Sequence, residues 1–328
     1  MATYKEIKGT GVQNFSSDPA NPIVGQVWYN TTSNILKVRK PEIGSWATAN
    51  SMNTARSGLA GVGIQTAALG IGGAIPLTTE SYNGTSWTEI NDLNTSRGLL
   101  GASGTQTAAL AFGGELAGFP TDPTAITESW NGTSWTEVND LNTAREYSSG
   151  CGATNTAALA FGGDLGPGNT PEMFGGTENW NGTSWTEVND LNSARSGLGV
   201  AGTNTAALAF GGTQVPVTPE IFGGTESWNG TSWTEVNDLN TARRGLAGAG
   251  TQTAALGFGG TTPPYSALTE SWNGTSWSEV NDLNTARLNL AGCGTQTAAL
   301  GFGGFAPPNT AATEEWSVSG GTQTISTS

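Results

Sequence analysis

A Glu, an Asn-Gly-Thr, an Asp and an Arg recur together at nearly fixed spacing five times in this sequence, as in 128-ESWNGTSWTEVNDLNTAR-145, and a sixth Glu and a sixth Arg stand at the two ends of the series. Three kinds of chemistry fit these residue types. The Glu and Arg could line a channel that binds a charged ligand. The Asp of the Asn-Asp pair could bind Ca²⁺ through its carboxylate, and Asn-Gly-Thr is an acceptor pattern for N-glycosylation.

A structural role competes with each of these interpretations. The Glu and Arg could form an ion pair, the Asp could cap a turn, and Asn-Gly could form a type I′ hairpin turn, because both residues tolerate positive φ angles. Identical copies of the Glu and Arg in every unit favour the ion pair, and catalysis would need an asymmetric cluster. The Asp carboxylates are isolated and lack the dense oxygen spacing of a calcium loop, and Asn-x-Thr is used only in a secretory pathway. The repeated charges are Glu80, Glu128, Glu178, Glu226, Glu270 and Glu314, with Arg56, Arg97, Arg145, Arg195, Arg243 and Arg287.

The composition argues against several classes of function. Lys and Arg number 12 against 26 Asp and Glu, a net charge of −14, and nucleic-acid binding needs clustered basic residues. The chain has no His, so the commonest general base and metal ligand are missing. We therefore expect a non-enzymatic protein with no metal site and no cofactor. Cys151 and Cys293 are too few for a disulfide framework and are expected to be free thiols.

The spacing of the repeats predicts a β-propeller. Successive copies begin 41 to 50 residues apart, which is a period typical of propeller blades or solenoid units. One unit contains four short strand-like segments, GLAGAGT, TAALGFGG, LTESWNG and TSWSEV, each bounded by turn residues. Four strands per unit favour a blade. We therefore expect an all-β, six-bladed propeller with four antiparallel strands in each blade.

The position of one Trp predicts how the ring closes. In complete repeats a Trp stands ten residues before the Arg, at Trp87, Trp135, Trp185, Trp233 and Trp277. Trp46 has the same spacing from Arg56, although no repeat precedes it, while the last repeat lacks such a Trp after Trp316. We therefore predict that 44-GSWATA-49 supplies the outer strand of the blade formed by residues 288–316.

The pattern resembles the kelch-type propeller family. In that family a Gly-Gly follows the second strand, an aromatic residue lies in the third, a Trp in the fourth, and an Arg often precedes the next blade. Here these residues are Gly113-Gly114, Trp130, Trp135 and Arg145. The resemblance covers about residues 44–316 and implies the fold. It implies no single function, since kelch rings include enzymes, scaffolds and adhesins.

The loop between the second and third strands varies from repeat to repeat. These loops are residues 74–78, 115–126, 164–176, 213–224, 261–268 and 305–312, and they hold eleven of the 14 Pro. All of them emerge on one face of a propeller, which predicts a recognition surface. Its candidate binding residues are Phe119, Asp122, Met173, Phe174, Phe222, Tyr265 and Phe305. The alternatives are drift in tolerant loops and, for Phe174 and Phe222, packing beneath the loops.

Residues 1–42 differ from the repeats and form a separate module. The segment 18-DPANPIVGQVWYNTTSNILKV-38 predicts a hairpin, with VWYN and ILKV as strands. Through Pro22, Gly25, Gln26, Trp28, Tyr29, Asn30 and Leu36 to Val38, it resembles the short N-terminal module of bacteriophage tail-fibre and virion proteins. The opening MATYKEIKGT and the TQTAALAFGG repeats are similar to virion proteins of marine phages. The resemblance implies attachment to the particle, for which Trp28, Tyr29 and Asn30 are the candidate residues. The N-terminus has no apolar segment typical of a signal peptide, and no run of residues approaches a membrane span.

We expect three regions: the attachment module at 1–42, the propeller at 43–316 and a Ser/Thr/Gly-rich tail at 317–328. The predicted function is a virion structural protein, in a fibre, spike or decoration, that recognises a host surface glycan or protein. Expected partners are other virion proteins and further copies of the chain. The chain would be made in the host cytoplasm and carried on the virion, and would otherwise remain cytoplasmic. The alternatives are a lectin with repeated sugar pockets between blades and a kelch-like scaffold for protein partners.

Overall fold

The computed structural model describes residues 12–73, 78–116, 122–169, 172–214 and 220–325. The chain divides into two compact units. The larger unit is Trp46–Ser317, and the smaller one combines Met1–Ser45 with Val318–Ser328. Strands are the regular elements of the described residues, and none of these residues forms a helix that could span a membrane.

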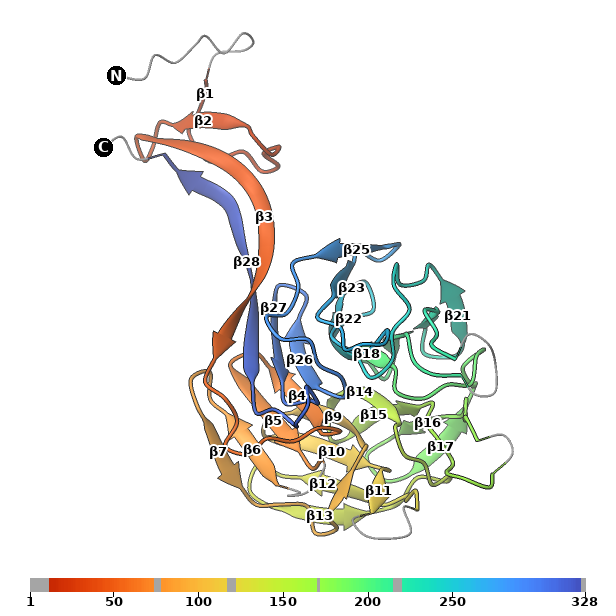
Figure 1. Cartoon of the computed structure of the whole chain (residues 1–328). Coiled ribbons are helices and arrows are strands. Elements are labelled where there is room, and N and C mark those ends of the chain that lie inside the picture. Colours follow the sequence, from red (N-terminus) through yellow and green to blue (C-terminus); the bar gives the residue numbers. More distant parts are fainter. Residues whose placement is uncertain (1–11, 74–77, 117–121, 170–171, 215–219, 326–328) are drawn as a thin grey trace. The chain divides into compact units, whose positions relative to one another are not determined.

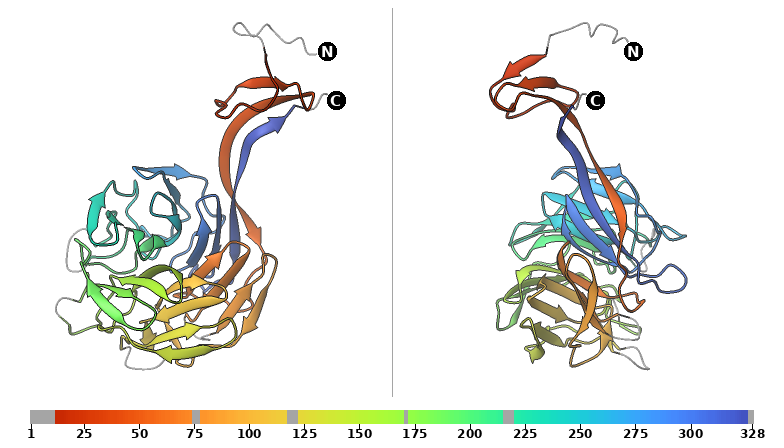
Figure 2. Two further views of the ribbon diagram at one scale, coloured as in Figure 1. Left: turned by 180° about the vertical axis from the view of Figure 1, so that it is seen from behind. Right: turned by 90° about the vertical axis from the view of Figure 1, so that its left-hand side faces the viewer.

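The larger unit is a β-propeller of four-stranded antiparallel blades around a central axis (Figure 1), seen from two further directions in Figure 2. The first blade consists of β4 (Ala60–Ile64), β5 (Ala67–Ile71), β6 (Thr79–Tyr82) and β7 (Trp87–Ile90). The second consists of β9 (Gly101–Thr105), β10 (Ala108–Phe112), β12 (Thr127–Trp130) and β13 (Trp135–Val138). The third consists of β14 (Ser149–Thr154), β15 (Ala157–Phe161), β16 (Thr177–Trp180) and β17 (Trp185–Val188).

Two more blades have the same form. The fourth consists of β18 (Gly199–Thr203), β19 (Ala206–Phe210), β20 (Thr225–Trp228) and β21 (Trp233–Val236). The fifth consists of β22 (Ala247–Thr251), β23 (Ala254–Phe258), β24 (Thr269–Trp272) and β25 (Trp277–Val280). In every blade the strands follow one another from the axis outward in chain order.

The sixth repeat is part of a six-stranded sheet with the order β1-β2-β3-β28-β27-β26. Its strands are β26 (Ala291–Thr295), β27 (Ala298–Phe302), β28 (Thr313–Thr324), β3 (Ile35–Ala49), β2 (Val27–Asn30) and β1 (Gln13–Phe15). The prediction of six four-stranded blades is therefore corrected to five. The reason is length: β3 has 15 residues and β28 has 12, so both run on past the length of a blade strand. Around the axis, β26 packs between β22 and β4.

The inner strands are rich in Gly and Ala because they crowd around the axis. A Cβ placed on Gly61 of β4 would lie 2.9 Å from Cζ of Phe302 and 3.1 Å from the carbonyl oxygen of Gly292. Real Cβ atoms rarely approach other atoms this closely, so a larger residue would push the inner strands apart. Larger side chains instead lie between the blades, where Leu110 and Phe112 of β10 are fully buried.

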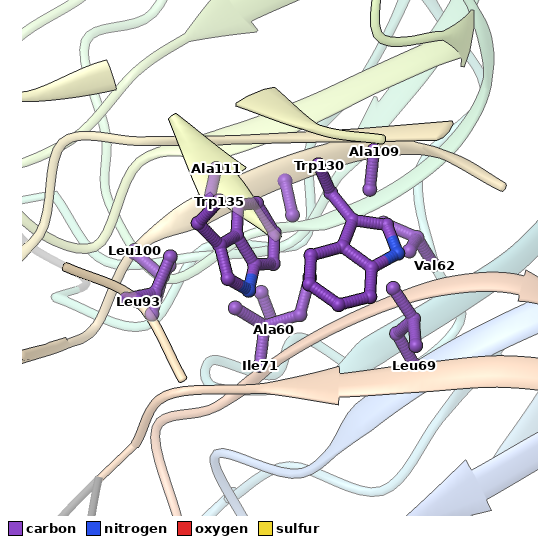
Figure 3. Close-up of a cluster of buried hydrophobic side chains, with 11 residues drawn as sticks. Ala60, Val62, Leu69, Ile71, Leu93, Leu100, Ala109, Ala111, Trp130 and Trp135 are labelled. Carbon is purple, nitrogen blue, oxygen red and sulfur yellow. The ribbon is translucent and has the colours of Figure 1, made fainter. Parts of the chain in front are cut away.

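Aromatic and aliphatic side chains of adjacent blades form the core. Between the first and second blades, Trp130 and Trp135 pack with Leu69, Ile71 and Leu100 (Figure 3). At other blade junctions a Phe replaces Ile71, and its ring centroid lies 4.8–5.0 Å from the outer-strand Trp of the next blade. An aromatic side chain removes roughly 150–250 Å² from water. At about 25 cal/mol per Å² this burial stabilises the fold by at most about 4–6 kcal/mol per ring, because part of the area is already buried in the unfolded chain.

The outer strand predicted at 44–49 is present, as the end of β3 hydrogen-bonded to β28. Trp46 Nε1 donates to Thr269 Oγ1 at 3.0 Å, and the same kind of bond joins Trp277 to Thr225. The Trp46 ring centroid lies 4.8 Å from that of Phe258, which is the spacing found at the regular blade junctions. The segment before the first repeat therefore completes the packing at the last one.

The Asn-Gly turn is not the predicted type I′ turn. Trp130 pairs directly with Trp135, which leaves a four-residue loop at 131–134. Within the Asn-Gly pair the positive φ belongs to Gly132, at 92°. Asn131 Oδ1 accepts hydrogen bonds from the backbone N–H groups of Thr133 and Ser134, both at 2.9 Å. The Asn side chain thus caps the turn and takes the place of a second left-handed residue.

Asp18 organises the smaller unit, in which β1 pairs parallel with β2, and β2 pairs antiparallel with β3. Its carboxylate accepts hydrogen bonds from Trp28 Nε1 at 3.2 Å and from Asn30 Nδ2 at 2.8 Å. Lys37 Nζ lies 2.6 Å from the other oxygen. The hydrogen bond from Lys37, followed by those from Asn30 and Trp28, lowers the pKa of Asp18 to about 2.

The C-terminal residues belong to the smaller unit, where they pair as a strand. β28 continues to Thr324. Ser319 Oγ donates to the carbonyl oxygen of Ile43 at 3.3 Å. The backbone N–H of Ile325 donates to the carbonyl oxygen of Leu36 at 2.8 Å. Both ends of the chain therefore contribute to one unit.

Candidate functional site

The repeated Arg and Glu form ion pairs buried within their blades. Arg145 donates to the Glu178 carboxylate, and the two side chains are 0% and 1% exposed. The other pairs are Arg56–Glu80 at 2.5 Å, Arg97–Glu128 at 3.4 Å, Arg195–Glu226 at 3.2 Å, Arg243–Glu270 at 3.0 Å and Arg287–Glu314 at 3.1 Å. Glu178 also accepts from the backbone N–H and the side chain of Asn142. All these Arg and Glu side chains are 0–2% exposed, so the repeated charges serve mainly to hold the frame together.

The Asp of each Asn-Asp pair caps the start of the third strand. Asp140 Oδ1 accepts the backbone N–H of Thr127 at 3.0 Å, and the same bond recurs in the other blades. This geometry fits a capping role and not a cation ligand. Among the described residues, no group of three or more carboxylates or thiols is placed to hold a metal ion. Cys151 and Cys293 are free and buried.

The repeated Trp side chains are buried. The outer-strand residues Trp46, Trp87, Trp135, Trp185, Trp233 and Trp277 are 5–6% exposed, and the third-strand Trp are 1–2% exposed. Sugar-binding pockets repeated between the blades would need at least one face of these rings open to solvent. The structure instead uses these rings as core.

Six backbone groups form a closed hydrogen-bonded ring at one end of the axis. Each N–H donates to the carbonyl oxygen of the residue before it in the ring, at 2.7–3.3 Å. The members of this axial ring are Gly58, Leu99, Tyr147, Gly197, Gly245 and Asn289. Each stands two residues after a repeated Arg, and all have φ between 48° and 65°. They line a central cavity of about 140 Å³ together with the inner strands.

Three members of the axial ring are not glycine. Leu99, Tyr147 and Asn289 hold left-handed φ angles, which cost an L-residue roughly 1–2 kcal/mol. Leu99 and Asn289 lie over neighbouring glycines, since a Cβ on Gly58 would meet Leu99 Cδ2 at 2.6 Å and a Cβ on Gly245 would meet Asn289 Oδ1 at 2.5 Å. A Cβ on Gly197 would meet no clash, because the nearest atom, the backbone nitrogen of Gly245, would lie 3.6 Å away in ordinary van der Waals contact.

Short ladders outside the axial ring fix the ends of the variable loops. In each ladder, the residue directly after the repeated Arg forms a β-bridge with the first residue of the loop. That first residue forms a second β-bridge with a residue near the end of the same loop. These rim ladders are Gly98–Glu115–Pro123, where β8 (Arg97–Gly98) pairs with β11 (Glu115–Leu116), then Glu146–Asp164–Met173, Ser196–Thr213–Ile221, Arg244–Thr261–Tyr265 and Leu288–Phe305–Asn309. From the second blade onward, the side chains of successive ladders carry carboxylates, then hydroxyl groups, then a guanidinium and finally apolar groups. A repeated frame thus presents one asymmetric face.

A pocket of about 500 Å³ opens on this face, and we call it the rim pocket. Gly197 and Gly245 of the axial ring line it; the Asn289 side chain lies over Gly245, whereas a Cβ on Gly197 would find no atom nearer than 3.6 Å. Tyr147 and Asn289 bound it on either side of these glycines. The pocket therefore lies where two successive ring positions are glycine.

The charged lining of the rim pocket is mainly acidic. Asp164, Glu172 and Glu220 line it with a single cation, Arg244. Arg244 Nη1 lies 3.0 Å from Glu220 Oε1, and these side chains are 42% and 59% exposed. The apolar lining comes from Met173, Tyr265 and Leu288.

Glu146 adjoins the pocket within a group of carboxylates. Burial is the main cause that raises its pKa, to about 7, and the neighbouring carboxylates of Glu115 and Asp164 add to the effect. The same surroundings raise the pKa of the Tyr147 phenol, again mainly through burial. The charge on this side of the rim therefore changes close to neutral pH.

The candidate binding residues of the sequence fall into three groups. Met173 and Tyr265 line the rim pocket, with Met173 itself 5% exposed. Phe174 and Phe222 pack on buried guanidinium groups, with Arg145 Cζ 4.6 Å from the first ring centroid and Arg195 Cζ 5.2 Å from the second. Phe305 packs edge-on against Tyr265 at 5.6 Å. Asp122 is exposed, and Phe119 lies outside the described residues.

Tyr147, Asn289, Arg244 and Glu220 line the rim pocket although the sequence did not predict them as binding residues. A signal for the first two existed, because the second residue after the repeated Arg is Gly in three copies and Leu, Tyr or Asn in the others. Such variation at one position of an otherwise regular repeat indicates that the propeller fold alone does not require a particular residue there.

The three candidate attachment residues serve mainly to hold the smaller unit together. Trp28 is 0% and Asn30 is 7% exposed, and both bond to Asp18 as described above. Tyr29 Oη donates to Asn34 Oδ1 at 3.2 Å. Among the described residues of this unit, the exposed large apolar side chains are Val12, Ile23, Val24, Ile43 and Ile325, at 37–73%.

Charge is distributed unevenly along the chain. Residues 46–317 carry 23 Asp and Glu against seven Arg, a formal charge of −16. Six of these Arg are the buried repeat residues, which leaves Arg244 as the basic residue at the surface of the propeller.

Comparison with known proteins supports the fold. No protein-family model matches the chain, and no curated protein is similar to it in sequence. Among solved structures, the one titled "Structure of YjhT" is similar, with a TM-score of 0.68 and 11% sequence identity. The likeness covers 83% of this chain and 99% of that one. At this identity it shows the propeller fold alone.

Proposed function

We propose that the chain is a non-enzymatic binding protein that presents its variable-loop face to a partner on a host cell surface. The observation that carries the proposal is the asymmetry of that face. The repeated Arg, Glu, Asp and Trp are all used by the frame, whereas the rim ladders differ from blade to blade and enclose a pocket. A rigid frame with one diversified face is suited to binding, because little ordering is needed when a partner docks.

We further propose that the protein is carried on a phage particle through its smaller unit, as a fibre, spike or decoration subunit that could assemble with further copies. The resemblance of residues 18–38 to virion modules supports this role. The exposed apolar side chains of Ile23, Val24 and Ile43 offer contact area on the same unit. Because Trp28 and Asn30 are internal, attachment would depend on these exposed residues.

A lectin with repeated sugar pockets is less well supported, since the Trp rings that would stack on sugars are 1–6% exposed. A single glycan or a protein bound at the rim is compatible with the structure. An intracellular scaffold would use the same face, and it differs from our proposal in the origin of the partner.

The test is binding of fluorescently labelled protein to a panel of marine bacteria, measured by flow cytometry beside a glycan array. A rim variant carries Asp122→Ala, Glu172→Ala and Tyr265→Ala. A control variant carries Thr133→Ala, Glu187→Ala and Glu279→Ala, at exposed positions away from the rim. We expect a cell strain or glycan that binds the wild type and the control but not the rim variant. Equal binding by all three proteins, or no binding to any cell or glycan, would contradict the proposal.

A further inference from the structure

We propose that the rim pocket binds a Lys or Arg side chain presented on an exposed segment of a partner protein. This inference rests on the proposed function, because it names the chemistry that the variable-loop face would recognise. It depends on the shape of the pocket, on its charge and on the apolar groups beside that charge.

The pocket, with a volume of about 500 Å³, has room for an extended side chain. Gly197 and Gly245 line it, and a Cβ on Gly197 would find no atom nearer than 3.6 Å. Tyr147 and Asn289 stand on either side of these glycines with φ angles of 48° and 51°. Such angles are costly for residues other than Gly, and costly backbone conformations concentrate at functional sites. Glycine would be less strained at these two positions, so the presence of Tyr147 and Asn289 indicates that their side chains have a role at the pocket.

The charge of the pocket favours a cation. Asp164, Glu172 and Glu220 face a single guanidinium, that of Arg244, which is already paired with Glu220. Two carboxylates are therefore left without a charge partner inside the pocket. The surrounding propeller has a formal charge of −16, and such a field increases the rate at which a basic partner arrives.

Apolar groups beside the carboxylates distinguish a basic side chain from other amines. Met173, Tyr265 and Leu288 line the same pocket. Lys and Arg place an aliphatic stem against apolar surface and extend the charged head to polar groups. The rings of Tyr147 and Tyr265 can add cation–π attraction. An amino sugar carries its ammonium on a ring covered with hydroxyl groups and would leave the apolar lining without a match.

Binding of short probes by isothermal titration calorimetry tests the inference. The probes are a hexalysine peptide, a hexaglutamate peptide and a chitosan hexamer. The pocket variant is Asp164→Asn with Glu172→Gln, and its control, Glu187→Gln with Glu279→Gln, changes the net charge equally at exposed outer-strand positions. Gly197→Asn fills the pocket with a residue that tolerates positive φ, as Asn289 does.

We expect hexalysine to bind the wild type, and the pocket variant and Gly197→Asn to weaken binding about tenfold or more. The control should stay within about twofold, because charges distant from the pocket act only through a screened field. Equal weakening by pocket variant and control, preference for the chitosan hexamer, or no binding of hexalysine would each overturn the inference.

Cell binding by the same variants separates the two proposals. If the pocket variant binds cells normally while the rim variant does not, the proposal that the pocket binds a Lys or Arg side chain is wrong. The proposal that the variable-loop face recognises a partner is then still supported.

Discussion

The indole N–H of Trp46 donates to Thr269 Oγ1 across 3.0 Å, although the two residues are 223 positions apart in the sequence. This bond ties the strand that precedes the first repeat to the fifth blade. The corresponding Trp135 has no such partner, since its Nε1 and the Thr79 Oγ1 are both buried without a hydrogen bond. The two tryptophans therefore form a natural pair for measuring what the bond contributes.

We predict that Trp46→Phe lowers the free energy of unfolding more than Trp135→Phe does. Both variants lose similar buried area, but only the first leaves a hydroxyl that had a partner unsatisfied. The difference should be about 1–3 kcal/mol. Urea denaturation of both variants, followed by circular dichroism, measures it. Equal losses would show that the bond at Trp46 adds nothing to closure.

Glu178→Gln should destabilise the propeller by about 3–5 kcal/mol, because it leaves the buried guanidinium of Arg145 without its counter-charge. Both side chains are at most 1% exposed. The matched control is Glu187→Gln on the exposed outer strand of the same blade, for which a change within about 0.5 kcal/mol is expected. Thermal unfolding of the two variants compares them. A Glu178→Gln protein as stable as its control would contradict the structural role assigned to the repeated ion pairs.

The pKa of Glu146 makes stability depend on pH. Its folded value of about 7 lies above the ordinary value of 4.5, so between these values the folded state binds more protons than the unfolded state. The contribution of Glu146 is therefore favourable at low pH and is lost as the pH rises from 4.5 to 7. Glu146→Gln should flatten the fall in Tm between pH 5 and pH 8. If Tm of the variant depends on pH as it does in the wild type, a group other than Glu146 causes the pH dependence.

Asp18→Ala should loosen the smaller unit and leave the propeller intact. The substitution removes the acceptor for Trp28, Asn30 and Lys37 together. Limited proteolysis should then cut within residues 12–40 much faster than in the wild type, while the propeller core stays resistant. Asp122→Ala, at an exposed loop position, is the control and should leave the smaller unit resistant. Unchanged cleavage in Asp18→Ala would show that Asp18 does not organise this unit.

Regular spacing made much of the fold predictable. Trp46 and Arg56 repeat the ten-residue interval of the complete units, which was enough to predict the closing strand. The equivalence of all six Arg correctly favoured a structural ion pair. The same regularity misled on the turn, because Asn-Gly suggests type I′ geometry while Asn131 Oδ1 caps a longer loop. It also hid the six-stranded sheet, since the sequence does not show that β3 and β28 stay paired beyond a blade.

The rim pocket could not be derived in the same way. Its walls include Tyr147, Arg244 and Asn289, which lie one or two residues after the repeated Arg in three different repeats. Only the closed ring brings these positions side by side. Phe174 and Phe222 look like binding residues in sequence because they are apolar and lie in variable loops. Their rings instead cover Arg145 and Arg195, as the alternative interpretation of their pattern anticipated.

Blocking one face at a time tests the central claim most directly. Both native thiols are buried with pKa values raised by that burial, so a single introduced Cys can be coupled selectively to polyethylene glycol. The measurement is cell binding by Glu172→Cys and Glu187→Cys proteins before and after coupling. We predict that the polymer at position 172, on the rim, abolishes binding and that the polymer at position 187, on the outer strand, leaves it unchanged. Binding that survives coupling at 172 and fails with coupling at 187 would contradict recognition through the variable-loop face.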